Sequence, residues 1–143
     1  MPSNDSSFWP LVILQLLSAS VLLGLIFAAP GPWDLQRLGG AILAFVSLCL
    51  LGVSRFQLGR SFSVTPQARA LVKRGIYSRI RNPIYVFSGS MIAGIILVLR
   101  RPVLWFFLAL LIPIQIVRAK REARVLEEHF GEEYRAYRSQ TWF

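Results

Sequence analysis

Four apolar runs, almost free of charge, decide what this chain can fold into. They cover residues 8–29, 35–53, 84–99 and 103–117 of the 143-residue sequence. With 55% hydrophobic residues gathered in such blocks, the chain is too apolar for an ordinary soluble domain. We therefore expect an all-α integral membrane protein, in which a single membrane domain, residues 1–143, forms a four-helix transmembrane bundle.

The boundaries of these runs predict how the helices connect. Pro30, Gly31 and Pro32 cannot continue a helix and end the first run. Arg37 lies near the start of the second run, where a long side chain can snorkel to the headgroups. The last two runs are separated only by residues 100–102 and predict a C-terminal helical hairpin. Both are shorter than the roughly 17 residues that a crossing usually needs, so partial insertion of this hairpin stays open.

Small residues mark faces on which the second and third runs can approach a neighbouring helix. Gly40 and Ala44 lie four residues apart, and residues 89–90 and 93–94, all small, repeat this spacing in the third run. A small-x-x-x-small pattern permits close contact between helix backbones. We therefore expect close helix packing at these faces.

The basic residues gather in two segments, the loop 54–83 and the tail 118–143, in a chain of net charge +9. Because Lys and Arg in short loops stay on the cytoplasmic side, both segments and the N-terminus are predicted to face the cytoplasm. Attraction to anionic membrane lipids explains this charge more simply than nucleic acid does, since no stacking platform or nucleic-acid-binding motif accompanies it. The dominance of Arg over Lys is typical of a GC-rich bacterial genome and favours a bacterial inner membrane.

The residue inventory excludes several kinds of catalytic site. Cys49 and His129 are the only cysteine and the only histidine, too few for a zinc site or an intrachain disulfide, and they are not plausible members of a Cys–His nucleophile pair. The sequence contains neither G-x-G-x-x-G nor a P-loop, the usual glycine-rich ways of holding a nucleotide. We expect Cys49 to be a buried inert thiol and His129 to be a surface or packing residue.

The segment 75–85 leads directly into the third apolar run. Asn82 and Pro83 are favourable residues at the start of a helix, as the cap and the first helical position. Arg79 and Arg81 flank this helix start, whose N–H groups are a ready site for an anion such as a carboxylate. Two interpretations stay open, a basic anchor at the membrane interface and a ligand site.

The tail predicts an amphipathic cytoplasmic helix that lies along the bundle or the interface and can kink at Gly131. Its apolar stripe is formed, at helical spacing, by Ala119, Ala123, Leu126, Phe130, Tyr134 and Tyr137. The charged residues that lie largely away from this stripe are Lys120, Arg121, Arg124, Glu127 and Glu128. Arg118 and Glu122 form an i,i+4 pair beside it, which is either a surface ion pair worth roughly a few tenths of a kcal/mol or part of a site next to the membrane.

Two motifs at these residues resemble those of the isoprenylcysteine carboxyl methyltransferase family and its phospholipid methyltransferase relatives, over residues 57–143. The first, G-x-Y-x-x-x-R-H-P-x-Y, is matched by Gly75, Tyr77, Arg81, Asn82, Pro83 and Tyr85. The second, E-E-x-x-L-x-x-x-F-G-x-E-Y-x-x-Y, is matched by Glu122, Leu126, Phe130, Gly131, Glu133, Tyr134 and Tyr137. Asn82 replaces the His of the first motif and cannot take up a proton. Ala123 replaces the second Glu of the other motif, so Glu122 must serve alone.

The resemblance implies an S-adenosylmethionine-dependent methyltransferase that acts at the cytoplasmic face on a lipophilic small molecule or lipid, without a metal. The residues implied to bind the cofactor are Gly75, Tyr77, Arg81, Asn82, Pro83, Tyr85 and Glu122. The implied catalytic residues are Arg118, which could orient an acceptor carboxylate, and Glu122, which could hold the cofactor or orient Arg118. Carboxylate O-methylation is favoured, because a carboxylate is already ionised near neutral pH and needs no strong base.

Two other function classes remain alternatives. One is a membrane NADPH-dependent reductase of the steroid-reductase type, a larger group with a similar C-terminal hairpin. The other is a catalytically inert membrane partner protein, which the changes at Asn82 and Ala123 keep open. Binding of S-adenosylhomocysteine or of NADPH distinguishes these classes. The identity of the acceptor, the choice among O-, N- and S-methylation and the oligomeric state also stay open.

Overall fold

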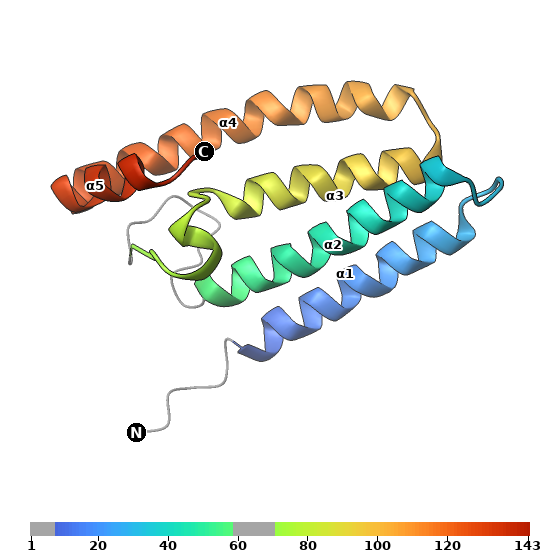
Figure 1. Cartoon of the computed structure of the whole chain (residues 1–143), viewed down its shortest axis with the longest axis horizontal. Coiled ribbons are helices and arrows are strands. Elements are labelled where there is room, and N and C mark those ends of the chain that lie inside the picture. Colours follow the sequence, from blue (N-terminus) through green and yellow to red (C-terminus); the bar gives the residue numbers. More distant parts are fainter. Residues whose placement is uncertain (1–7, 59–70) are drawn as a thin grey trace.

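A computed structural model describes residues 8–58 and 71–143 (Figure 1). The described residues form five α-helices and one short 3₁₀ helix, so the expected all-α class is confirmed. The elements are α1 (Phe8–Ala28), α2 (Leu35–Leu58), η3 (Gly75–Ser78), α3 (Pro83–Leu99), α4 (Val103–Phe130) and α5 (Glu132–Gln140). The middle of the predicted loop, with Arg60 and Arg69, lies outside the described residues.

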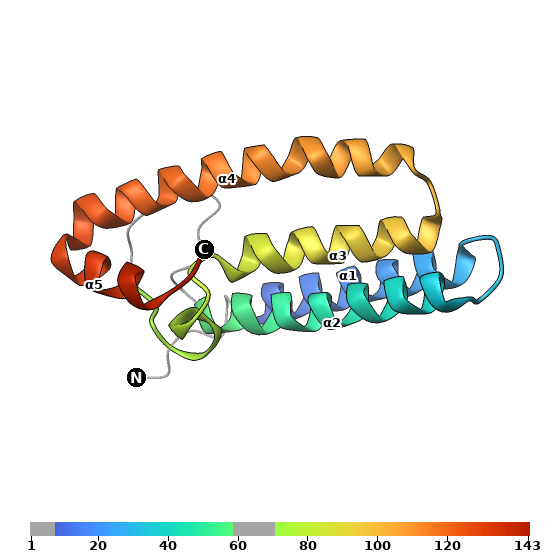
Figure 2. The same cartoon turned by 45° about the horizontal axis from the view of Figure 1, so that its top comes forward.

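The four long helices run antiparallel to their neighbours in the chain (Figures 1 and 2). The connections at residues 29–34 and 100–102 lie at one end, whereas η3, α5 and the C-terminus lie at the other. Pro83 occupies the first turn of α3, as predicted, and Arg100 ends this helix in a left-handed conformation with φ 54°. The described residues of both basic segments therefore lie at one end of the molecule.

Small residues let α2 and α3 pack backbone to backbone, which confirms the predicted close helix contact. A Cβ added to Gly94 would lie 2.6 Å from the backbone nitrogen of Ala44, and one added to Gly40 would lie 2.8 Å from the carbonyl oxygen of Gly94. Real side chains do not tolerate such distances to backbone atoms. The α2–α3 contact is the most extensive of the fold, and these glycines make it possible.

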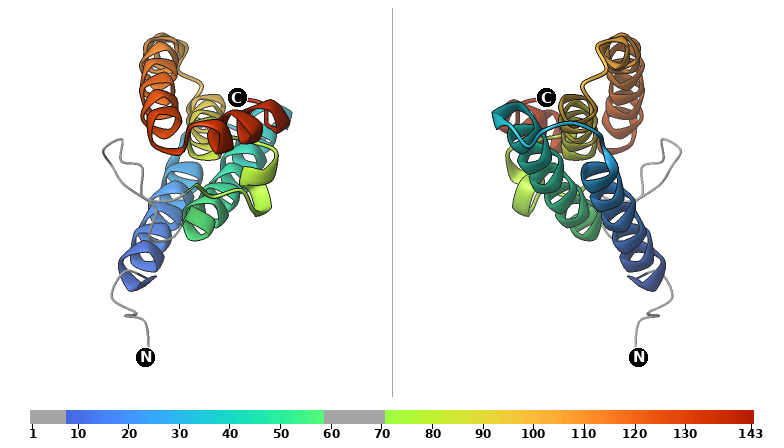
Figure 3. Two further views of the ribbon diagram at one scale, coloured as in Figure 1. Left: turned by 90° about the vertical axis from the view of Figure 1, so that its left-hand side faces the viewer. Right: turned by 90° about the vertical axis from the view of Figure 1, so that its right-hand side faces the viewer.

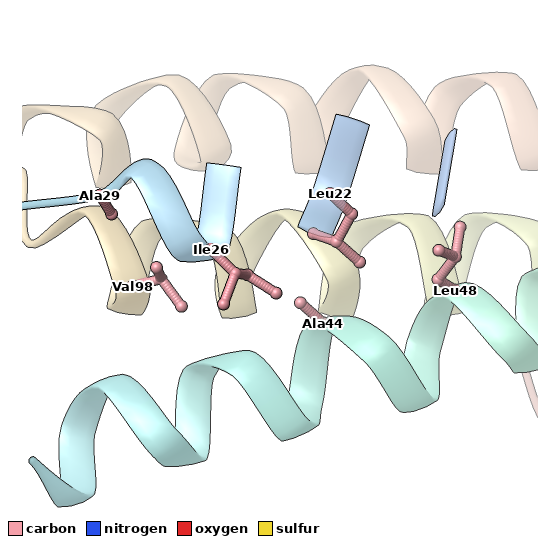
Figure 4. Close-up of a cluster of buried hydrophobic side chains, with 6 residues drawn as sticks. All are labelled: Leu22, Ile26, Ala29, Ala44, Leu48 and Val98. Atoms are coloured by element: carbon pink, nitrogen blue, oxygen red, sulfur yellow. The ribbon is translucent and has the colours of Figure 1, made fainter. Parts of the chain in front are cut away.

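Helix α1 completes a small apolar core on this pair. The buried side chains of the core are Leu22, Ile26 and Ala29 of α1, Ala44 and Leu48 of α2, and Val98 of α3 (Figure 4). Many other apolar side chains on these helices are exposed, as expected for surfaces that face lipid. Cys49 belongs to this outer surface, so the prediction of a buried thiol is wrong, because α2 turns its small residues and Leu48 inward instead.

Helix α4 stands apart from the other three (Figures 2 and 3). Its contact with α3 is far smaller than the contact between α2 and α3. By length and composition, α2 and α4 can each cross a membrane, and α1 and α3 contribute shorter apolar helices. The apolar part of α4 is residues 103–117, and the polar remainder extends beyond it.

The predicted separate tail helix is wrong in its first half. Residues 118–130 continue α4 without a break, because no glycine or proline interrupts them before Gly131. Gly131, with φ 52°, ends the helix where the kink was predicted. The short α5 then turns back across the end of α3 (Figure 3).

The helix α2 also runs further than predicted, to Leu58 rather than residue 53. Ser54 is fully buried and donates a hydrogen bond to the carbonyl of Leu50 at 2.7 Å. This burial against the bundle keeps the polar end of α2 helical. The loop of the sequence-based prediction therefore begins after residue 58.

Arg37 does not snorkel to the membrane surface, because its guanidinium satisfies backbone carbonyls at the end of α1. The side chain is 2% exposed and donates to the carbonyls of Gly31 at 2.5 Å and Ile26 at 2.7 Å. The carbonyl of Ile26 is one of the acceptors that the last turn of α1 leaves unpaired, and Gly31 belongs to the turn that follows. At the same end of the bundle, Arg100 forms a salt bridge with Asp34, so this arginine is partly neutralised.

Candidate functional site

Hydrogen bonds join the two sequence motifs at the polar end of the bundle. The hydroxyl of Tyr137 donates to the backbone carbonyl of Tyr77 at 2.7 Å. The hydroxyl of Tyr85, on α3, donates to the carboxylate of Glu122, on α4, at 3.1 Å. Lys73 and Glu133 add a salt bridge of 2.7 Å between the same two regions. The motifs therefore form one cluster, although they lie far apart in the sequence.

The last residues of the chain pair with the end of the first motif. Trp142 donates its N–H to the carbonyl of Arg79 at 3.0 Å and accepts from the N–H of Arg81 at 3.2 Å. The N–H of Asn82 donates to the carbonyl of Phe143 at 2.9 Å. Asn82 holds the N-cap position of α3, but its side chain makes no capping hydrogen bond, so the capping prediction is wrong for the amide group.

A polar cavity of about 420 Å³ lies beside this pairing. Its lining residues are Arg81 and Asn82 of the first motif, Ile116, Ala119, Lys120, Ala123, Arg124 and Glu127 of α4, and Arg138 and Phe143 near the C-terminus. Four basic side chains face one carboxylate here. The Nε of Arg81 is buried and has no hydrogen-bond partner among the described residues. Such a cavity suits a ligand that carries an anionic group.

An apolar cavity of about 430 Å³ separates α3 from α4. It is lined by Tyr85, Val86, Gly89, Ser90 and Ala93 of α3, by Leu108, Ile112, Gln115 and Ile116 of α4, and by Phe143. The small residues Gly89 and Ala93 thus open space beside α4, whereas Gly94 packs on α2. A lipophilic chain suits this cavity.

Burial raises the pKa of Glu122, which lies beyond the apolar part of α4. The hydrogen bond from Tyr85 and the positive charge of Arg118 act in the opposite direction without cancelling the effect of burial. Burial likewise raises the pKa of Tyr77, and the charge of Glu122 adds to this effect. The hydroxyl of Tyr77 has no hydrogen-bond partner within the described residues. The carboxylate therefore sits in a poorly solvated environment lined by tyrosine.

The structure divides the predicted cofactor-binding residues into two groups. Arg81 and Asn82 line the polar cavity and Tyr85 lines the apolar one. The residues Gly75, Tyr77 and Pro83 line neither cavity, and two of them are buried, with Tyr77 packed at 6% exposure. These two shape the first motif rather than present side chains to the cavities.

Gly75 has a backbone conformation that favours glycine. It adopts φ 61°, and an added Cβ would collide with the side chain of Gln57. That glutamine accepts a hydrogen bond from the N–H of Ile76 at 2.8 Å. The sequence-based reasoning missed Gln57, because nothing in its spacing links the end of α2 to η3.

The predicted catalytic pair, Arg118 and Glu122, lines neither cavity. Arg118 is an exposed residue of α4 whose charge acts on both Tyr85 and Glu122. Glu122 is intermediate in exposure and meets the apolar cavity only through Tyr85, to which it is hydrogen-bonded. Their arrangement places a cation, a carboxylate and a hydroxyl in one contact group.

Several cavity residues were assigned by the sequence pattern to the outer face of the tail. Lys120, Arg124 and Glu127 recur at spacings of 4 and 3, so they share a helix face, and this face lines the polar cavity. The helical spacing could have grouped them. The sequence could not predict that this face lines a cavity, because the cavity also depends on the position of the residues near the C-terminus.

A comparison with protein families indicates the family of this chain. The family model described as phospholipid methyltransferase matches residues 35–133, a range that contains α2, η3, α3 and α4. No curated protein and no solved structure matches the chain. The matched range covers most of the residues that line both cavities.

Proposed function

We propose that this chain, which belongs to the phospholipid methyltransferase family, transfers a methyl group from S-adenosylmethionine to a lipophilic acceptor at the cytoplasmic surface of a membrane. The observation that carries the proposal is the meeting of two cavities of opposite character. A polar, cationic cavity and an apolar one share Ile116 and Phe143 as lining residues. A water-soluble donor and a membrane-soluble acceptor could meet there.

The polar cavity fits S-adenosylmethionine in size and in its donor groups. Its volume of about 420 Å³ lies within the range of roughly 300–1,000 Å³ typical of ligand sites. The unpartnered Nε of Arg81 would bind the carboxylate of the methionine moiety. Asn82 and Glu127 would supply polar contacts, the latter to the ammonium group. The buried residues of the first motif would hold Arg81 and Asn82 in position.

When bound, S-adenosylmethionine supplies an electrophilic methyl group, and the electrons of the broken carbon–sulfur bond remain on sulfur while the acceptor forms the new bond. Arg118 would orient an acceptor carboxylate by its charge. Glu122 would hold the cofactor's positive end or orient Arg118, and would fix the hydroxyl of Tyr85. A carboxylate acceptor has no proton to lose, so positioning and electrostatics suffice.

The proposal places the apolar cavity within the membrane and the polar cavity at its cytoplasmic surface. The four long helices would form a multi-pass bundle, with residues 1–143 as one membrane domain. The basic residues at the end that carries η3 and α5 support a cytoplasmic orientation and contact with anionic lipids. A bacterial inner membrane remains the proposed location.

A second candidate acceptor is the amine of a phospholipid headgroup. The description of the family favours a phospholipid. An ammonium group must lose a proton before it can accept a methyl group, and the raised pKa of Glu122 makes that carboxylate a better proton acceptor. His129 is exposed, packs edge-on against Phe130 and lines neither cavity.

Labelled methyl transfer into lipid extracts tests the proposed function. The purified protein in detergent is incubated with S-adenosylmethionine that carries a labelled methyl group, and the lipid product is treated with alkali. A methyl ester releases labelled methanol, whereas an N-methylated lipid retains its label. Label in neither product would contradict methyl transfer to these acceptors.

A binding experiment tests the cofactor site independently of the acceptor. We expect wild-type protein to bind S-adenosylhomocysteine and not NADPH, and Arg81→Ala to weaken the binding. Arg79→Ala is the matched control, because Arg79 is exposed and lines neither cavity. Saturable NADPH binding without S-adenosylhomocysteine binding would favour the reductase alternative. Binding of neither ligand would favour an inert partner protein.

A further inference from the structure

Phe143 stands at the boundary between the two cavities. Among the described residues that line the polar and apolar cavities, it and Ile116 are common to both. Ile116 and Phe143 are thus the lining residues closest to both ligands if one ligand occupies each cavity. The boundary therefore combines one aliphatic and one aromatic surface.

The backbone around Phe143 is fixed to the first motif. Its carbonyl accepts from the N–H of Asn82, and Trp142 exchanges hydrogen bonds with Arg79 and Arg81. Arg81 and Asn82 themselves line the polar cavity. The backbone position of Phe143 is thus set by the same segment that lines the proposed cofactor site. The residue remains 38% exposed, so tertiary packing leaves much of its surface available.

Two carboxylates of α4 in this region, Glu122 and Glu127, already have partners. Glu122 accepts a hydrogen bond from Tyr85. Glu127 forms salt bridges with Arg135 at 2.9 Å and with Arg138 at 3.7 Å. Part of the hydrogen-bonding capacity of each carboxylate is therefore already used. A cation at the boundary would meet the ring of Phe143 as an additional partner that carries no formal charge.

We infer that the ring of Phe143 contacts the methylsulfonium group of S-adenosylmethionine and favours this cation over the neutral sulfur of S-adenosylhomocysteine. The inference rests on the proposed function and assigns a cofactor-selective role to a residue outside both sequence motifs. The physical basis is the attraction of a cation to the negative face of an aromatic ring. The aliphatic Ile116 cannot supply this attraction. Selectivity for the charged form would also help the product cofactor to leave.

The test compares the affinities of the two cofactor forms by calorimetry in detergent, without an acceptor. Phe143→Leu keeps an apolar side chain and removes the ring, and we expect it to weaken S-adenosylmethionine binding about two- to fivefold while S-adenosylhomocysteine binding stays unchanged. Phe143→Tyr keeps a ring and should retain the wild-type ratio of affinities. Trp142→Leu is the matched control, because its exposed side chain lines neither cavity.

Each result distinguishes this inference from the proposed function. Wild-type binding of both cofactor forms with an unchanged ratio in Phe143→Leu would overturn the ring contact and leave the proposed function intact. Equal weakening of the binding of both cofactor forms would also overturn it and would show that Phe143 only shapes the cavity. If the wild-type protein binds neither form, the proposed function itself fails.

Discussion

The hydroxyl of Tyr137 reaches the backbone carbonyl of Tyr77 at 2.7 Å across a separation of 60 residues. Both residues are 6% exposed, so the bond is sheltered from water. Tyr137→Phe leaves that carbonyl without its donor, and we expect the free energy of unfolding to fall by about 1–3 kcal/mol. Denaturant unfolding in detergent measures the change.

Tyr134→Phe is the matched control for this prediction. Tyr134 is fully buried, and its hydroxyl has no hydrogen-bond partner in the part of the chain that the structure describes. Removal of an unsatisfied hydroxyl should leave stability unchanged or increase it. Equal destabilisation in the two variants would show that the Tyr137 hydrogen bond contributes nothing specific.

Gly94 should tolerate no larger residue. Its added Cβ would collide with backbone atoms of Ala44 and Gly40, which cannot move without separating α2 from α3. We expect Gly94→Leu to prevent assembly of the bundle and Gly94→Ala to lower its melting temperature. Gly39→Ala is the control, because no atom lies within 4 Å of its added Cβ. Full yield and wild-type melting of Gly94→Leu would show that this face does not pack on α2.

The partly buried carboxyl of Glu122 should make stability depend on pH. Because its pKa is raised in the folded protein, protonation favours folding. This stabilisation is complete below the pKa of the unfolded chain, near 4.5, and is lost as pH rises through the folded value. We expect Glu122→Gln, which is always neutral, to melt above wild type at neutral pH and to lose this advantage on acidification. A melting difference that does not change with pH would contradict the prediction.

The Arg118–Glu122 pair should separate cofactor affinity from transfer rate. We expect Glu122→Ala to abolish S-adenosylhomocysteine binding or turnover, and Arg118→Ala to slow single-turnover methylation by losing the group that orients an anionic acceptor. Arg121→Ala is the control, since Arg121 is an exposed residue of α4 that lines neither cavity. If both variants keep the wild-type affinity for S-adenosylhomocysteine and the wild-type methylation rate, Arg118 and Glu122 form only a surface ion pair.

Sequence patterns predicted the parts of the fold that local chemistry controls. The apolar runs correspond to α1, α2, α3 and the first part of α4, Pro83 begins α3 and Gly131 ends α4. Gly94 and Gly40 predicted close packing, because glycines in transmembrane helices let the backbones of two helices approach each other. In each case the local structure follows from the chemistry of the residue at that position.

The features that the sequence could not predict depend on distant partners. Arg37 was expected at the membrane surface, but unpaired carbonyls at the end of α1 attract it inward. The pairing of Trp142 and Phe143 with residues 79–82 has no signal in either segment. Among the motif residues, Arg81, Asn82 and Tyr85 line the cavities, whereas the position of Phe143 in both linings required the three-dimensional arrangement.

The ligands of the two cavities would come from different phases, water and lipid, so their concentrations must be expressed in different units. On the proposed assignment, occupancy of the polar cavity follows the molarity of cofactor in water. Occupancy of the apolar cavity between α3 and α4 follows the mole fraction of acceptor among the surrounding lipids. Adding inert lipid at constant total acceptor would then slow turnover by surface dilution, and the acceptor's KM would be a property of the bilayer's composition rather than of the bulk solution.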